Sequence, residues 1–244
     1  MKIVLLRVGI DSGCGGCQAP VFEDGSFEFV PIPTDNPEET RLYANTRCLG
    51  SGRQDKFLLD FLPQPAQRRL QKKAMHVDPE FETFTYGDPT PPKGRLRELE
   101  KGDLLVFYAG LEGLSCPIPP GLYIVGFFEV ERAVRAREHQ RERLLSDFGN
   151  NFHVRHPAVF AADTIDKKDL VLVKGSARSR LLKRARLISS LGQDKAGKPL
   201  KVLSKEMQMI FGTFGKLNSF QRCPPHWVAP EFIEAAREFV LGLE

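Results

Sequence analysis

Long apolar runs and an ordered set of cysteines are both missing from this chain of 244 residues. No run approaches the roughly 18 apolar residues that a membrane-crossing helix needs, and the N-terminus lacks the basic stretch and apolar segment of a secretory signal. The five cysteines, at positions 14, 17, 48, 116 and 223, are odd in number and widely scattered, unlike the framework of a secreted disulfide-bonded domain. We therefore expect a soluble, cytoplasmic protein with reduced thiols and no membrane association.

The composition favours one folded domain with a polyanionic partner. Hydrophobic residues make up 41% of the chain and aromatic residues 9%, enough for a packed core, so we expect a single domain over residues 1–244. Residues 1–130 hold 14 Lys and Arg against 18 Asp and Glu, whereas residues 131–244 hold 21 against 13. The resulting net charges, −4 and +8, suit nucleic acid or a nucleotide as partner, because neutralising phosphates releases counterions. The sequence leaves cofactors and protein partners unknown.

Periodicity and turn residues predict an α+β fold with a mostly antiparallel, curved sheet. Apolar runs bounded by turn formers predict strands at residues 2–8, 104–109, 122–130 and 169–173. A hairpin is expected over residues 21–32, with Asp24 and Gly25 in its turn. Helices are expected at residues 66–73, 131–147, 179–187, 204–211 and 230–243, and residues 56–62 fit either a short helix or an extended segment.

Residues 101–131, KGDLLVFYAGLEGLSCPIPPGLYIVGFFEVE, join two predicted strands through a loop rich in Gly and Pro. Gly126 lies within the second strand, where a missing side chain often marks a bulge or the close approach of another group. The pattern resembles the core hairpin of the PUA-like superfamily, which includes the EVE, YTH and ASCH domains. That resemblance implies a PUA-like barrel with flanking helices, centred on residues 95–190, and a pocket that binds one modified base of a nucleic acid.

A longer resemblance covers most of the chain. The segments MKIVLLRVGIDSGCGGCQAPVFEDGSFEFVPIP, MHVDPEFETFTYGD and KGDLLVFYAGLE are together similar to the third nucleotide-modification-associated domain family. That resemblance implies a setting of nucleotide modification, in which bases of DNA or RNA are changed. It assigns no reaction and no catalytic residue, so the candidate sites depend on the residues themselves.

The chemically richest segment is a stretch with Pro and Gly at residues 76–88. A histidine beside a carboxylate can act as a general base, and a tyrosine can donate to a developing charge. The same groups can instead satisfy backbone atoms in a turn. His76 and Asp78 could supply two metal ligands, but no residue at a familiar spacing supplies a third, so no metal site is predicted. We predict these catalytic residues: His76, Asp78, Tyr86 and Asp88.

A glycine-rich loop follows the first predicted strand. Its backbone amides can cradle a phosphate or a base edge, although the spacing is neither that of a P-loop nor that of a dinucleotide-binding motif. Cys14 and Cys17 form a C-x-x-C pair, which fits small residues at a tight turn, redox chemistry or half a zinc site. Nearby aromatic residues can stack on an extruded base or belong to the core. The predicted base pocket consists of Asp11, Ser12, Gly13, Phe107, Tyr108 and Tyr123.

Residues 174–186 hold six basic and no acidic residues. They follow a predicted strand and open from a Gly-Ser turn, so the amides of a helix start and the guanidinium groups after it can hold phosphate. A solvated charged face is the alternative. The predicted nucleic-acid contacts are Lys174, Ser176, Arg178, Arg180, Lys183 and Arg184.

Two functions from different classes follow from these features. The first is a nucleobase-modifying enzyme of unknown reaction type, which holds a base in a barrel pocket and phosphate at the basic cluster, and uses residues 76–88 for acid–base chemistry. The second is a non-catalytic reader of modified DNA or RNA. A nuclease is not favoured, because no cluster of carboxylates with a lysine stands out.

Overall fold

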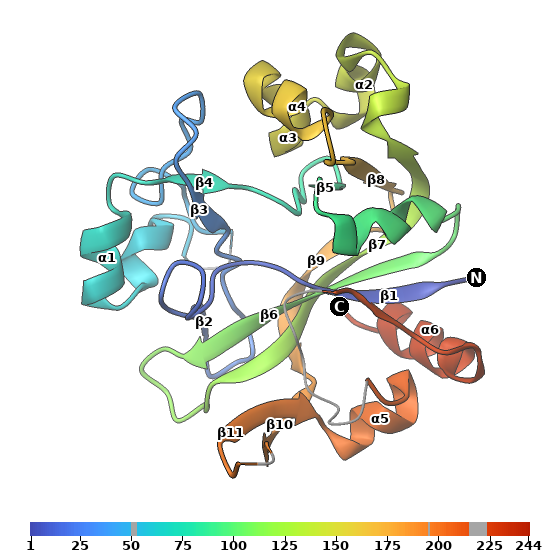
Figure 1. Ribbon diagram of the computed structural model, residues 1–244. Helices are drawn as coiled ribbons and strands as arrows, with labels where there is room; N and C mark the ends of the chain where they lie inside the picture. The colour runs from blue at the N-terminus through green and yellow to red at the C-terminus, as the bar shows by residue number, and fades with distance from the viewer. Residues whose placement is uncertain (50–52, 195, 215–223) are drawn as a thin grey trace.

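The computed structural model describes residues 1–49, 53–194, 196–214 and 224–244. Figure 1 shows a central sheet with three groups of smaller elements around it. The strands are β1 (Ile3–Arg7), β2 (Ala19–Val21), β3 (Ile32–Thr34), β4 (Ala74–His76), β5 (Thr85–Asp88), β6 (Leu104–Gly113), β7 (Gly121–Arg135), β8 (Val171–Gly175), β9 (Arg180–Leu187), β10 (Ser189–Gln193), β11 (Pro199–Leu203) and β12 (His226–Trp227). The helices are α1 (Gln64–Leu70), α2 (Arg141–Phe148), α3 (Phe152–Arg155), α4 (Pro157–Asp163), α5 (Lys205–Phe211) and α6 (Ile233–Leu241). Short 3₁₀ turns are η1 (Leu58–Phe61), η2 (Pro91–Glu98), η3 (Ala136–Glu138) and η4 (Pro230–Phe232).

The sheet is open and mostly antiparallel. Its strand order is β12-β1-β6-β7-β8-β5, with β2 also paired to β6 and β9 also paired to β7. β1 and β2 run parallel to β6, and the other pairs in this sheet are antiparallel. The expected mixture of helices with a mostly antiparallel sheet is confirmed. Among the described strands no pairing joins β12 to β5, so the PUA-like barrel is not confirmed.

The long strand β7 links the two halves of the sheet. Its first half lies between β6 and β9, and its last residues pair with β8 instead. Gly126 lies where the pairing with β9 slips, and a Cβ atom there would be 2.7 Å from the carbonyl oxygen of Arg180 and 2.7 Å from the ring of Phe81. The expectation of a bulge or a close approach at Gly126 is therefore confirmed.

The far half of β7 carries the chain to a separate small core. Strand β8 pairs there with β5, and helices α2, α3 and α4 cover this end of the sheet, at the top of Figure 1. Helices α5 and α6 lie near β1 on the other side of the molecule. The small core consists of Ala136, Leu144, Phe148, Val154, Phe160, Leu170 and Leu172.

Several expected elements are confirmed. β1, α1, α5 and α6 fall within or beside the predicted ranges, and Ser204 caps α5, because its side chain accepts a hydrogen bond from the backbone nitrogen of Met207. The hairpin expected over 21–32 is confirmed only next to its turn, where Val21 and Phe27 form an antiparallel bridge and the nitrogen of Phe22 donates to the oxygen of Ser26. None of the helices among the described residues combines the length and the apolar character needed to cross a membrane.

Two helix predictions were wrong. Residues 180–187 form strand β9, because β7 offers an unpaired edge and the apolar side chains in this range pack against the main core. Of the helix expected over 131–147, residues 131–135 instead complete β7, Ala136–Glu138 form the 3₁₀ turn η3, and α-helix begins only at Arg141. In both ranges pairing with a distant strand overrides a charge-rich pattern that suits helices.

Candidate active site

The loop before β5 is a tightly bonded turn. The backbones of Glu80 and Thr85 exchange hydrogen bonds of 2.8 and 3.0 Å. The buried carboxylate of Glu80 also accepts a hydrogen bond of 2.9 Å from the backbone nitrogen of Thr83. His76, at the end of β4, and Asp78 precede this turn, so both side chains are held on a fixed backbone beside β5.

Helix α3 brings a second histidine to the same place. The side chain of Asn151 caps the helix by accepting a hydrogen bond of 3.0 Å from the backbone nitrogen of His153. A Cβ atom at Gly87 would lie 2.9 Å from Cδ2 of His153 and 3.0 Å from Oδ1 of Asn151. The missing side chain at Gly87 therefore lets α3 lie directly on β5.

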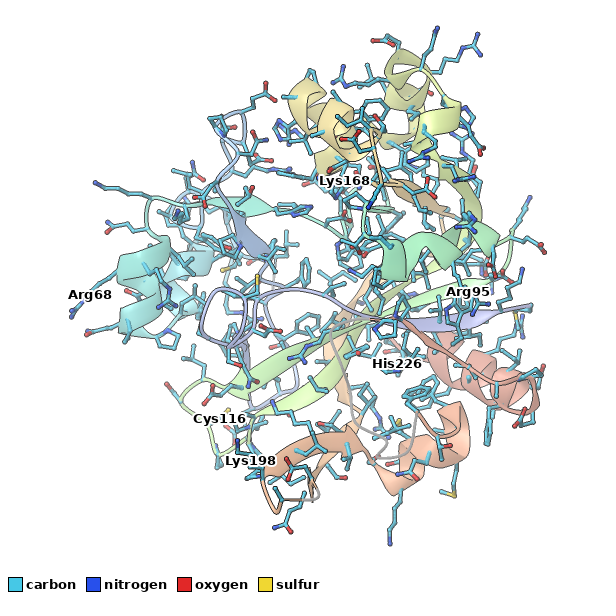
Figure 2. All side chains as sticks on the ribbon, in the orientation of Figure 1. Arg68, Arg95, Cys116, Lys168, Lys198 and His226 are labelled. Atoms are coloured by element: carbon cyan, nitrogen blue, oxygen red, sulfur yellow. The ribbon has the colours of Figure 1, made fainter. Side chains whose placement is uncertain are left out.

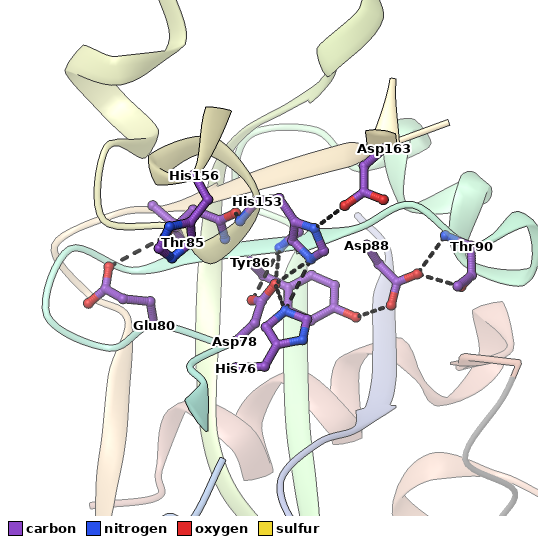
Figure 3. Close-up of polar contacts among 12 residues, drawn as sticks. His76, Asp78, Glu80, Thr85, Tyr86, Asp88, Thr90, His153, His156 and Asp163 are labelled. Carbon is purple, nitrogen blue, oxygen red and sulfur yellow. Dashed lines mark hydrogen bonds and ion pairs between the residues drawn. The ribbon is translucent and has the colours of Figure 1, made fainter. Parts of the chain in front are cut away.

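His76, Asp78 and His153 converge on one point, as Figure 3 shows. The two Nε2 atoms of the histidines are 3.2 Å apart, and Oδ2 of Asp78 is 3.5 Å from Nε2 of His153 and 4.0 Å from Nε2 of His76. The side chains of Asp78 and His153 are 4% and 5% exposed, whereas that of His76 is 22% exposed. His76 therefore forms the solvent-facing edge of the cluster.

Each member of this cluster is oriented by a further contact. Nδ1 of His153 lies 2.7 Å from Oδ2 of Asp163, whose other oxygen accepts a hydrogen bond of 2.7 Å from Nζ of Lys168. Lys168 lies beside α3 and α4 (Figure 2). The carboxylate of Asp78 accepts hydrogen bonds of 2.9 and 3.2 Å from the backbone nitrogen of Gly87. The ring of His76 packs against Phe152, with the centroids 4.0 Å apart.

Burial and neighbouring charges separate the pKa values of the cluster. Burial lowers the pKa of His76 well below its usual value, and His153 lowers it further. Burial also disfavours a charged His153, but its contacts with Asp163 and Asp78 outweigh burial and raise its pKa to about 9. Burial raises the pKa of Asp78 to about 6, although contact with His153 opposes this. A proton on Nε2 of His153 lies within reach of both His76 and Asp78.

The family comparison agrees with the resemblance found in the sequence. Residues 2–229 match the model of nucleotide modification associated domain 3. The chain belongs to this family. Comparison with curated proteins and with solved structures finds no match. The name of the family links the protein with nucleotide modification and assigns no residue to it.

In this family member, the four predicted catalytic residues fall into two pairs. His76 and Asp78 belong to the convergent cluster. The hydroxyl of Tyr86 donates to Oδ2 of Asp88 at 3.1 Å, and the same carboxylate accepts hydrogen bonds from Lys93 and from the backbone of Thr90. Asp88 thus belongs to a local network of its own, although its charge contributes to the raised pKa of Asp78.

Sequence reasoning missed His153 and Asp163. Both lie more than 70 residues beyond His76, after the stretch 131–147 that the charge pattern predicts as a helix, and no candidate residue was predicted there. The available signal was composition: the chain has five histidines, and His153 and His156 are three residues apart. This spacing alone does not identify which distant carboxylate faces each ring.

The second of these histidines takes part in a different cluster. Nε2 of His156 lies 3.1 Å from Oε2 of Glu39, and the same carboxylate accepts hydrogen bonds of 3.1 and 2.8 Å from the guanidinium of Arg41. The backbone nitrogens of Thr40 and Arg41 also donate to it at 3.0 Å. Burial would raise the pKa of Glu39, but these donors outweigh burial and lower it to about 2.

The predicted phosphate-binding residues do not form one uniform patch. Arg178 pairs with Glu129 at 3.3 Å, and Nζ of Lys174 donates to the backbone oxygen of Thr83. Residues 174–186 contain no acidic residue, but Glu129 from β7 neutralises part of their charge. The helix start invoked for this cluster is absent, since a turn and strand β9 occupy the range. The other predicted contacts are Ser176, Arg180, Lys183 and Arg184.

Lys183 and Arg184 differ from the rest of the basic cluster. Both are exposed on β9, and they line a cavity of about 910 Å³ between β9, the turn at residues 24–28 and the C-terminal residues 242–244. Arg186 also lines this cavity, and so do the acidic residues Asp24, Glu28 and Glu244. Lys183 and Arg184 are thus positioned to contact a ligand, and their role as phosphate contacts stays a prediction.

The predicted base pocket is dispersed. Phe107 and Tyr108 are fully buried and Tyr123 is 5% exposed, so stacking on a base would require the core to open. Ser12 and Gly13 line a cavity of about 410 Å³ that also includes Arg69. Their role in binding a base stays a prediction.

The glycine-rich loop is a tight turn. The carboxylate of Asp11 accepts hydrogen bonds from the backbone nitrogens of Gly13 and Cys14, and Gly15 and Gly16 have positive φ. The reading as small residues at a tight turn therefore fits. The four cysteines that the structure describes are free, burial raises the pKa of Cys17, and Cys223 lies outside the described residues.

Proposed function

We propose that this protein is a nucleobase-modifying enzyme whose active centre is the cluster of His76, Asp78, His153 and Asp163. The observation that carries the proposal is the convergence of two imidazoles and a carboxylate, from segments far apart in the sequence, within 4.0 Å of one another. Membership of a family associated with nucleotide modification supplies the substrate class. The reaction itself is left open.

The geometry supports acid–base chemistry at this cluster. His76 is the most accessible member, with 22% of its side chain exposed, so its ring is the group best placed to meet a substrate, and His153 behind it is positioned by Asp163. A histidine that is oriented by a carboxylate and touches a second ionisable group is a typical arrangement for moving a proton in catalysis. Burying several ionisable groups together also costs stability, which favours a functional reason for the cluster.

A nucleic acid or a nucleotide is the proposed partner. Lys183 and Arg184 are exposed beside a large cavity, and guanidinium and ammonium groups bind phosphate. This part of the proposal is independent of the histidine cluster. A reader of modified nucleic acid needs such a contact surface but has no need for a proton-transfer group.

The test compares modified nucleosides in DNA and tRNA of the native host, by digestion and mass spectrometry, with the gene present, deleted, and restored as wild type or as Asp78→Asn. We expect one modified nucleoside to vanish on deletion, to return with the wild type and to stay absent with Asp78→Asn at equal protein level. Identical profiles in all four strains would contradict the proposal. Restoration by Asp78→Asn would exclude the cluster as the active centre, whereas identical profiles would favour the reader.

A further inference from the structure

Three side chains in the candidate active site direct ligand atoms to one point. We propose that Nε2 of His76, Oδ2 of Asp78 and Nε2 of His153 bind a divalent first-row transition-metal ion. These are also the residues that form a group with the spacing of metal ligands within the part of the chain that the structure describes. The inference concerns the same site as the proposed function and rests on it for any role of the ion in catalysis.

The distances between the three atoms fit a shared ion. Metal–nitrogen and metal–oxygen bonds of about 2.0–2.2 Å with tetrahedral angles place neighbouring ligand atoms about 3.4 Å apart. The observed separations are 3.2 Å between the two nitrogens and 3.5 Å between Asp78 and His153. The third separation, 4.0 Å between Asp78 and His76, would need an angle of roughly 130° or more at the ion with such bonds, so one side chain must rotate to bring the site closer to a tetrahedron.

The surrounding contacts are those that metal ligands need. Because the carboxylate of Asp163 can only accept, it holds the proton of His153 on Nδ1 and directs the Nε2 lone pair toward Asp78 and His76. The carboxylate of Asp78 is fixed in turn by the backbone nitrogen of Gly87. Carboxylate–histidine pairs of this kind orient the ring and increase its strength as a ligand.

A cation at this point would also balance the negative charge of the Asp78 carboxylate. Asp78 accepts hydrogen bonds from the backbone nitrogen of Gly87, and its other close polar neighbours are the ring nitrogens of His153 and His76, at 3.5 and 4.0 Å. A nearly buried carboxylate is costly unless a positive charge is close, and either a bound ion or a protonated His153 would supply that charge. A hydrogen-bonded pair of histidines, one of them protonated, is the competing explanation, and it requires no ion.

The ligand set indicates the class of ion and the type of site. Two imidazoles and one carboxylate suit Zn²⁺, Fe²⁺ or Co²⁺ better than Mg²⁺ or Ca²⁺, which prefer oxygen ligands. Three protein ligands leave at least one coordination position for water or substrate, which is characteristic of catalytic sites. The partly exposed ring of His76 places this position toward solvent.

The experiment titrates the full-length protein, after treatment with a chelator, with CoCl₂ and follows the visible absorption of bound Co²⁺. We expect one Co²⁺ per chain, with bands of nitrogen and oxygen ligands and no thiolate charge-transfer band. Loss of an orienting carboxylate typically weakens metal binding about 10- to 100-fold, so Asp163→Asn should fall in that range and His76→Gln and Asp78→Asn should lose about 100-fold or more.

Two controls separate this site from the rest of the chain. His139→Gln changes an exposed histidine, and Cys14→Ser with Cys17→Ser removes the other candidate ligand pair, so both should bind Co²⁺ like the wild type. Zn²⁺ should raise the melting temperature of the wild type and not that of His76→Gln, which also verifies that the variant is folded.

Two results would overturn the metal site. One is the absence of stoichiometric Co²⁺ binding by the folded wild type, and the other is binding that His76→Gln and Asp78→Asn leave unchanged. Neither depends on substrate, so acid–base catalysis by a metal-free cluster would survive both. Conversely, a bound ion together with unchanged nucleoside profiles would retain the site and contradict the proposed function.

Discussion

Two histidines three residues apart have contrasting surroundings. His153 on α3 and His156 directly after it are both buried, both touch the ring of Phe152 and both meet a carboxylate. The carboxylate at His156 is saturated by the guanidinium of Arg41 and by backbone donors. His156 also faces a second carboxylate, that of the exposed Glu38, 3.6 Å from its Nδ1. At His153, by contrast, a second histidine and a nearly buried second carboxylate meet at the same ring nitrogen. A buried histidine–carboxylate contact thus occurs twice in these few residues, and the one at His153 is joined by further ligand atoms directed at the same point.

The largest effect is expected from a change in the cluster around His153. His76→Gln removes the exposed member of the cluster, so the rate of nucleoside modification should fall by about 100-fold or more. The ring of His76 is mostly buried and packs on Phe152, so the variant should also melt at a somewhat lower temperature and is compared at equal levels of folded protein. The measurement is product formation by mass spectrometry together with a thermal melt, with His139→Gln as the control. A variant that keeps wild-type activity would exclude His76 from the active centre.

The next effect concerns Glu39, the carboxylate beside His156, and its influence on stability depends on pH. The groups facing Glu39 are Arg41, Arg155 and His156. Folding lowers the pKa of Glu39 from 4.5 to about 2. The ionised carboxylate therefore stabilises the folded protein fully above pH 4.5, and this stabilisation is lost as the pH falls toward 2. The shift corresponds to about 3 kcal/mol of unfolding free energy.

Urea unfolding across this pH range measures the contribution. Glu39→Gln should be less stable than the wild type at neutral pH, because it leaves Arg41 without its partner, and should lose less stability on acidification. Its Co²⁺ binding should stay intact. Equal acid sensitivity of the two proteins would show that Glu39 is not the group responsible.

A smaller effect tests how closely α3 approaches β5. Gly87→Ala places a methyl group against the ring of His153 and the side chain of Asn151, and such overpacking typically costs about 1–3 kcal/mol. Because the ring must move, Co²⁺ affinity should fall as well. The matched control is Gly94→Ala, because a methyl group there meets only the flexible side chain of Arg97. Gly102→Ala would not serve as a control, because Gly102 has a positive φ. A fully stable Gly87→Ala with normal Co²⁺ binding would contradict this packing.

The smallest expected effect lies away from both histidines. Replacing Lys183 and Arg184 together by alanine should weaken nucleic-acid binding and reduce the slope of log K against log salt by about 2, because each residue contributes about one phosphate contact. Co²⁺ stoichiometry should not change. Fluorescence anisotropy at several salt concentrations provides the measurement, and an unchanged slope would remove β9 from the nucleic-acid interface.

Local patterns predicted elements whose packing agrees with their own sequence. The apolar runs of β6 and β7, the Ser204 cap of α5 and the amphipathic α6 follow from periodicity and capping. Strand β9 does not, because its basic residues suit a helix and only the exposed edge of β7 makes it a strand. Pairing between distant segments is invisible to a local pattern.

For the same reason, only part of the candidate site was predicted from the sequence. His76 and Asp78 lie two residues apart, so their chemistry could be read together from one loop. The third ligand atom comes from His153, which reaches them only because β8 pairs with β5 and Gly87 leaves room for α3. Sequence spacing therefore brought His76 and Asp78 together as candidate catalytic residues, and it gave no reason to expect a third ligand or a metal site.

The most direct test of this account uses the two buried histidines as a matched pair. The modified nucleosides of the deletion strain are measured after complementation with His153→Gln or with His156→Gln, at equal levels of folded protein. We expect His156→Gln to restore the nucleoside that the deletion removes and His153→Gln to leave it absent. Restoration by both variants would contradict the assignment of the active centre to the His153 cluster.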